Sequence, residues 1–261
     1  MADGWGRAVT LRIHLAGTMC LERDEILVSG RRLPGRQGRL AFAMLAAERE
    51  RPVSTEELAG ELWHGEPPRA WEVAVRAIVS KLRVVLAEAG LEGREVLPHA
   101  FGCYQLRLPP DAWIDLEAAA EAAHRAESSL LARDPSDAMG WALVANAIAR
   151  RGFLPGEDGG WASRRRRELQ DVRVRALECR ATVQLGAGSP AAAIPDLELV
   201  LDLEPFRETA YRLLMRAHAE AGNPAEALRA FRRCRTTLAD ELGVDPSPET
   251  RAVHLDILRS A

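Results

Sequence analysis

Residues 53–86 read VSTEELAGELWHGEPPRAWEVAVRAIVSKLRVVL, and this stretch decides the fold of the first part of the chain. Ser54 followed three residues later by Glu57 is a capping box, which predicts that a helix starts here. Glycine and proline at 65–68 end that helix, and a second one is expected from about Arg69 to Glu88. The apolar residues expected to face the core from this second helix are Val75, Val79, Leu82 and Leu86. Two helices joined by a tight Gly/Pro turn are typical of a helix-turn-helix.

The flanking segments extend this pattern into a winged helix. Alternating residues predict short strands at 11–15, 19–23 and 26–28, ahead of an amphipathic helix that carries Leu40 and Met44 on its inner face. After the third helix, Val96-Leu97 and Tyr104–Leu108 are strand-like and are joined by a short loop that ends in Gly102. A small sheet, three helices and a β-hairpin predict a winged helix-turn-helix domain over residues 8–110, which ends at Pro109-Pro110.

The remainder of the chain is expected to be helical. Alanine-rich amphipathic segments lie near 115–133, 136–151, 161–187, 190–203, 206–221, 224–242 and 247–259, separated by glycine and proline. Gly188–Ile194 matches Gly222–Leu228 at a shift of 34 residues. About 34 residues is the tetratricopeptide period, in which small residues let paired helices approach closely. We therefore expect a tetratricopeptide-like helical domain over residues 111–261.

Composition and motifs exclude several classes of protein. No apolar run is long enough for a transmembrane helix, and Met1–Thr10 lacks the apolar core of a signal peptide, so we expect a cytoplasmic protein. The four cysteines lie far apart and form no zinc-binding pair. Nucleophile-elbow, Walker A and dinucleotide-binding motifs are absent, which argues against an enzyme. We expect no catalytic residues, no metal and no cofactor.

The helix at 69–88 carries the residues that best fit nucleic-acid chemistry. Arg76, Lys81 and Arg83 supply donors for guanine acceptors or phosphates, and Ala77 and Ser80 allow close approach. The net charge of the chain is −3, and residues 1–110 are nearly neutral, with 15 basic and 14 acidic side chains. Cations must therefore be concentrated on one face if this domain binds DNA. The alternative is the ordinary solvated face of an amphipathic helix.

A family resemblance adds to these residues. Val53–Leu58, Leu62-Trp63, Pro67–Arg69 and Val79–Arg83 resemble the winged-helix effector domain of response regulators, in the version found in Streptomyces antibiotic regulatory proteins (SARPs). The wing at 102–106 and the segment at 35–40 are similar as well. The helical half resembles the bacterial transcriptional activation domain of SARPs at Phe153–Asp158, Trp161 and residues 225–246.

The resemblance implies where contacts would lie. Arg69, Arg76, Ala77, Ser80, Lys81, Arg83 and His99 would contact DNA. His99–Gly102 would approach the minor groove, while Arg36, Arg39 and His64 would contact phosphate or RNA polymerase. The chain departs from the family pattern at the wing tip, which has no arginine, and after Arg83, where Val84 replaces a second basic residue.

The resemblance thus predicts a sequence-specific transcription regulator that binds double-stranded DNA and recruits RNA polymerase holoenzyme as an activator. The helical domain would mediate homodimerisation, polymerase contact, or both. The alternative is a protein- or ligand-binding interaction module with a degenerate winged helix. Arg164–Arg167 has two interpretations, a second nucleic-acid or anion contact and a basic helix surface with acidic neighbours.

Overall fold

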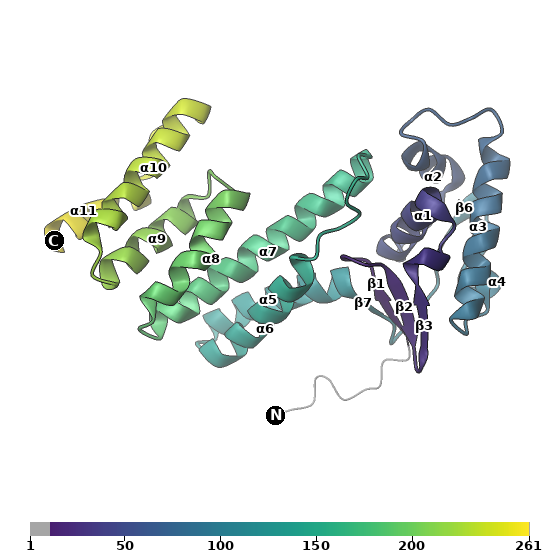
Figure 1. The fold of residues 1–261 in the computed structure, drawn as a ribbon, viewed down its shortest axis with the longest axis horizontal. Coiled ribbons are helices and arrows are strands. Elements are labelled where there is room, and N and C mark those ends of the chain that lie inside the picture. The colour runs from purple at the N-terminus through teal and green to yellow at the C-terminus, as the bar shows by residue number, and fades with distance from the viewer. Residues whose placement is uncertain (1–10, 261) are drawn as a thin grey trace. The chain divides into compact units, whose positions relative to one another are not determined.

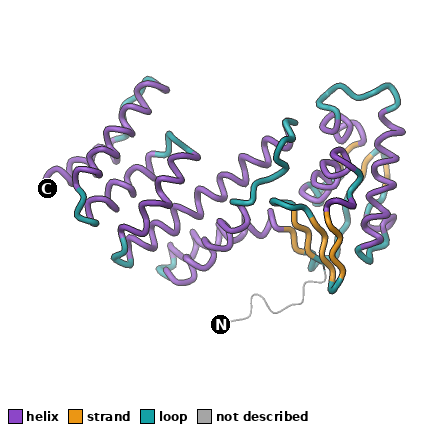
Figure 2. Tube along the Cα trace, in the orientation of Figure 1, coloured by secondary structure: helices purple, strands orange, loops and turns teal. Residues whose placement is uncertain are grey.

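A computed structural model describes residues 11–260 of the chain, so Met1–Thr10 and the first residues of the predicted domain at 8–110 lie outside the described part. The chain forms two compact units. Unit 1 contains the residues up to Ala118 together with Arg151–Leu169, and unit 2 contains Ala119–Arg150 and Gln170–Ala261. All described strands belong to unit 1 (Figure 2). None of the described helices is both long and apolar enough to span a membrane.

Unit 1 opens with a four-stranded sheet in the order β3-β2-β1-β7. Strands β1 (Arg12–His14), β2 (Cys20–Arg23) and β3 (Ile26–Ser29) pair antiparallel, as predicted, while β7 (Trp113–Ile114) joins β1 in parallel. The backbone amides of Leu15 and Ala16 donate to the fully buried carboxylate of Asp115, at 2.8 and 2.9 Å. This carboxylate ties the start of the sheet to the segment that leaves unit 1.

The helices of unit 1 pack on one another beside this sheet (Figure 1). They are α1 (Gly35–Ala47), α2 (Thr55–Leu62), α3 (Trp71–Glu88) and the short α4 (Gly93–Val96), after a 3-10 turn at Gly30–Arg32. The Ser54 hydroxyl accepts from the Glu57 amide at 2.9 Å, so the predicted helix cap is confirmed. Every residue of α1 from Leu40 to Ala46 is buried, which makes α1 the central helix instead of the one-sided helix we expected.

The predicted hairpin forms, but its first strand lies three residues later than predicted, and its second strand begins one residue earlier and is shorter. A second sheet of β4 (Val53–Ser54), β6 (Cys103–Tyr104) and β5 (His99–Ala100) holds it, with the turn at Phe101-Gly102. Val96, predicted as strand, ends α4 instead. At its start α4 packs closely on α3, since a Cβ added at Gly93 would lie 2.3 Å from the Arg83 carbonyl oxygen. That contact depends on the tertiary fold.

Residues 151–169 return to unit 1 from the middle of the chain. Phe153 forms a β-bridge with Ala16, and the Trp161 indole Nε1 donates to Glu48 Oε1 at 2.8 Å. Within the basic run at 164–167, Arg165 Nη2 lies 2.5 Å from Glu48 Oε1, and Arg166 donates to the backbone carbonyls of Leu154 and Glu157. These contacts give half of the run a structural role and favour the interpretation as a basic helix surface.

The other helices form a tetratricopeptide-like stack, and the fold class is confirmed. They are α5 (Asp115–Leu131), α6 (Pro135–Ala149), α7 (Gly160–Gly186), α8 (Pro190–Leu203), α9 (Glu208–Glu220), α10 (Pro224–Leu242) and α11 (Pro248–Ser260). Helix α9 packs against α8, α10 and α11. The buried side chains between them include Leu197, Tyr211, Leu214 and Met215.

The 34-residue repeat is visible in the backbone. The caps Ser189 and Asn223 have φ of −115° and −114° and ψ of 56° and 60°. Each follows a glycine with positive φ, 68° at Gly188 and 78° at Gly222, and each precedes a proline in the first turn of a helix. Glycine is favoured there because residues with a side chain rarely adopt this conformation. The matching turns confirm that the two segments are copies of one helical hairpin.

Candidate nucleic-acid interface

Helix α3 has two contrasting faces. Val75, Val79 and Leu82 are at most 1% exposed and pack into unit 1, as their spacing predicted. The opposite face is exposed, and its exposed residues are Glu72, Val73, Arg76, Ala77, Ser80, Lys81, Val84, Ala87 and Glu88. An 18-residue helix with one face free in this way is long enough to follow a DNA groove for about 27 Å.

The cations of this face differ in how freely they can bind a partner. Arg76 Nη2 lies 3.3 Å from Glu72 Oε2, in an exposed pair that solvent screens strongly. Within residues 11–260, neither Arg69 nor Lys81 has an ion pair or side-chain hydrogen bond, and both are exposed. Arg69, Arg76 and Lys81 can therefore meet phosphates or base edges at little cost to the fold.

Arg83 has a different environment from the other predicted contact residues. Its guanidinium donates to the Leu97 carbonyl oxygen twice, with Nε at 3.1 Å and Nη2 at 2.8 Å. The side chain is half-buried and joins α3 to the segment that leads into the wing. Arg83 thus positions the hairpin relative to α3.

The wing is a rigid hairpin with an apolar tip. The backbone amide and hydroxyl of Thr55 both donate to the Gly102 carbonyl oxygen, at 2.9 and 2.7 Å. The rings of His99 and Tyr104 lie 4.5 Å apart, and burial raises the pKa of the Tyr104 phenol although Arg83 and Arg76 are nearby. Phe101 is fully exposed, at 104%, with a φ of 51°, in the left-handed region that bulky side chains avoid.

A cleft joins the wing to the start of α3. It has a volume of about 310 Å³ and is lined by the first residues of α2 and α3 and by the hairpin, with Trp71, Arg76, His99 and Phe101 in its wall. The free backbone N–H groups at helix N-termini favour anions, but Glu56 and Glu72 at these two helix starts oppose that effect. The structure thus brings together His99 and Arg76 from the predicted DNA-binding set.

Two of the residues predicted to contact polymerase or phosphate lie together elsewhere in unit 1. Arg36 Nη2 lies 2.8 Å from His64 Nε2, and Arg36 Nε donates to Glu157 Oε1 at 2.9 Å. Arg39, one turn further along α1, is exposed and has neither an ion pair nor a side-chain hydrogen bond among the described residues. Arg36 is therefore held by the returning segment and contacts His64, whereas Arg39 is available to a partner.

Comparison with known proteins identifies the family. The model of the bacterial transcriptional activator domain matches residues 114–258, which is more than half of the chain. Curated relatives include the SARP-type regulators AfsR, EmbR and RedD. The chain belongs to the SARP family of transcription regulators.

The relatives cover both units of this SARP-family chain. Regulatory protein AfsR of Streptomyces coelicolor is 33% identical over 96% of the chain, and EmbR of Mycobacterium tuberculosis is 32% identical over 85%. The solved structure of M. tuberculosis EmbR, in complex with a low-affinity phosphopeptide, covers 96% of the chain with a TM-score of 0.86 and 29% identity. The chain spans only 24% of AfsR and 57% of EmbR.

Two residues of the candidate interface were not assigned a role by the sequence. Val73 and Val84 are 64% and 59% exposed on α3. The departure at Val84 was visible in the sequence, but Val73 looked like one more apolar residue of an amphipathic helix. Counting eleven residues from one valine to the other, about three helical turns, would have placed both on the free face.

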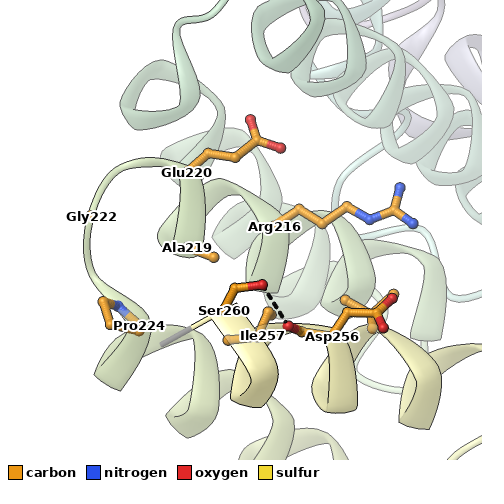
Figure 3. Close-up of a pocket in the computed structure, with 9 residues that line it drawn as sticks. Arg216, Ala219, Glu220, Gly222, Pro224, Asp256, Ile257 and Ser260 are labelled. Carbon is orange, nitrogen blue, oxygen red and sulfur yellow. Dashed lines mark hydrogen bonds between the residues drawn. The ribbon is translucent and has the colours of Figure 1, made fainter.

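Unit 2 of this SARP-family chain contains a second cavity, of about 520 Å³ (Figure 3). Arg216 and Glu220 of α9 and Asp256 and Ile257 of α11 line it, together with the turn at Gly222–Pro224. The Ser260 hydroxyl donates to the Asp256 backbone carbonyl oxygen at 2.8 Å, which closes the last turn of α11. Charged side chains of both signs and the apolar residues Val253 and Ile257 line this cavity.

Proposed function

We propose that this chain is a sequence-specific DNA-binding regulator that activates transcription in the bacterial cytoplasm. The observation that carries the proposal is the exposed face of α3, where Arg76 and Lys81 project from the side of the helix opposite the core. Family membership supports the same assignment, since the relatives are transcription regulators. In this proposal residues 8–110 form the DNA-binding domain and residues 111–261 form the activation domain.

In this proposal α3 enters the major groove and the wing approaches the adjacent minor groove. Arg76 offers two donors to guanine O6 and N7, while Ala77 and Ser80 permit close approach. Arg69 and Lys81 neutralise phosphates, which supplies the salt-dependent part of the affinity. His99 lies in the wall of the cleft beside Arg76 and completes the contact surface. Arg83 acts through the hairpin that it holds.

The proposed partner in activation is RNA polymerase holoenzyme. His64–Pro68 is exposed between α2 and α3, and Arg39 is exposed on α1. Neither segment belongs to the free face of α3, so neither is assigned a DNA contact in this proposal. We assign Arg36 and His64 to the edge of this polymerase-facing surface. We assign homodimerisation, or a further contact with polymerase, to unit 2.

The test uses fragments selected from a genomic DNA pool by the full chain. Changing both Arg76 and Lys81 to alanine should weaken binding by about 100-fold, at about 1.4 kcal/mol for each contact. Because Lys81 is the one of the two assigned to phosphate, the slope of log affinity against log salt should fall by about 1. Arg83 is left intact because its truncation would also loosen the hairpin.

Arg229→Ala with Arg259→Ala is the matched control, since it removes two exposed cations from unit 2, each of which, like Arg76, has an acidic neighbour on its own helix. Unchanged binding by the Arg76 and Lys81 variant would overturn the assignment of α3. No salt-dependent binding by the wild-type chain would favour the second candidate, an interaction module whose ligand occupies the cavity between α9 and α11.

A further inference from the structure

Two exposed valines lie on the free face of α3. Val73 is 64% and Val84 is 59% exposed. They are separated by eleven residues, so at about 3.6 residues per turn they point in nearly the same direction, about 16 Å apart along the helix. The buried residues Val75, Val79 and Leu82 point the opposite way. The two valines thus lie on the side of α3 opposite the core.

Folding does not explain these valines. β-Branched residues lose rotamer freedom in a helix, so valine is a poorer choice than alanine at an exposed position. Neither side chain is buried, so neither recovers that loss by packing within the described chain. A role in contacting a partner would explain both positions.

The charges around the valines indicate the partner. Counting about 100° per residue, Arg76 lies to one side of the line between the valines and Lys81 lies to the other. The acidic residues of this face, Glu72 and Glu88, form ion pairs with Arg76 and Arg32, which leaves Lys81 as a charge without an ion pair among the described residues. An apolar line with a cation on each side complements a groove whose two walls are phosphate backbones and whose floor presents an apolar group. In the major groove of DNA that apolar group is the C5-methyl of thymine, which no other standard base has.

We propose that Val73 and Val84 are specificity-determining residues that contact thymine methyl groups in the major groove. This inference rests on the proposed function and adds the base class that the helix selects. At about 3.4 Å per base step, the two contacts are separated by up to about five steps. Each valine exchanges contact with water for contact with a methyl group, so discrimination arises without a hydrogen bond.

The experiment replaces thymine by uracil, one position at a time, in a selected DNA fragment. Uracil lacks only the C5-methyl group, so hydrogen bonding and phosphate contacts are unchanged. The full-length wild-type chain should lose affinity by about three- to tenfold at two positions or clusters of positions. Val73→Ala should abolish the loss at one of them and Val84→Ala at the other. Leu131→Ala, which truncates an 88% exposed leucine in unit 2, is the matched control and should leave both losses in place.

The outcomes separate this inference from the function on which it rests. If the Arg76 and Lys81 variant binds poorly while uracil changes nothing, DNA binding stands and the valine contact is overturned. Equal weakening of a valine variant on thymine and uracil fragments would also overturn it. Failure of the wild-type chain to bind any selected fragment would remove the proposed function, and the inference with it.

Discussion

At the scale of single residues, Phe101 combines two unfavourable features. Its φ of 51° places the backbone in the left-handed region, and its ring is fully exposed, so burial does not offset the strain. Phe101 and Gly102 both have positive φ in a two-residue hairpin turn, the geometry in which Asn-Gly is favoured. A sequence with asparagine in place of Phe101 is therefore expected to make the hairpin turn more stable.

Phe101→Asn should stabilise the protein by about 1 kcal/mol, since asparagine adopts the left-handed region more readily than phenylalanine. Urea unfolding followed by circular dichroism would measure the gain. Phe101→Ile serves as the opposite control, because a β-branched residue is strained more in this conformation and should destabilise the hairpin. A destabilised Asn variant would contradict this account of the turn.

Local residue signals allowed part of the candidate site to be predicted. The Ser54 cap and the outward position of Arg76 and Lys81 depend on residues a few positions apart, which sequence patterns capture. The contact from Arg83 to Leu97 joins residues 14 positions apart across a turn, and the pair of Arg36 and Glu157 joins residues 121 apart. Such contacts depend on the tertiary fold and could not be predicted from local patterns.

At the scale of elements, the long helices and the strands β1 to β3 were predicted nearly to the residue, but the two-residue strands were not. The segments that form α8, α10 and α7 are 14 to 27 residues long, and proline or glycine marks their ends. Strands of two residues, such as β4 and β7, have too few positions to show alternation and form only because a partner strand is present. Secondary structure that depends on pairing carries little local signal.

Helix α8 contains a proline in its interior. Pro195 is exposed at the sixth position of the helix and has no N–H to donate to the carbonyl one turn earlier. Pro195→Ala should restore that hydrogen bond and stabilise the chain by about 1–2 kcal/mol, after allowance for the freer unfolded state.

Thermal unfolding followed by far-UV circular dichroism would measure this gain. Pro190→Ala is the matched control, because a proline in the first turn of a helix sacrifices no hydrogen bond. An equal response of the two variants would show that the interior position of Pro195 carries no special cost.

At the scale of the whole molecule, Glu48 connects segments that are distant in the sequence. Its carboxylate accepts from Trp161 Nε1 at 2.8 Å, Arg165 Nη2 at 2.5 Å and Arg51 Nε at 2.8 Å. Burial raises the pKa of Glu48, but the hydrogen bonds from Trp161, Arg165 and Arg51 outweigh it and hold the pKa below the usual value of 4.5. The charged form of Glu48 therefore stabilises the folded state.

Because the folded pKa is depressed, this stabilisation is present above the usual pKa and is lost as the pH falls through the folded value. Glu48→Gln should cost about 2 kcal/mol at neutral pH, and its difference from the wild type should shrink on acidification below about pH 4. Urea unfolding at several pH values, followed by tryptophan fluorescence, would show this. Glu50→Gln, whose side chain is 86% exposed, should behave like the wild type throughout.

The return of residues 151–169 to unit 1 has a consequence for biosynthesis. A chain emerging from the ribosome can form the sheet and α1–α3 early, but Trp161 and Arg165 reach Glu48 only after α5 and α6 have been translated. Domains generally fold as units in the order in which they are made. In this chain the first unit is completed only when translation has passed well into the second, so a ribosome that stalls before residue 169 leaves it unfinished.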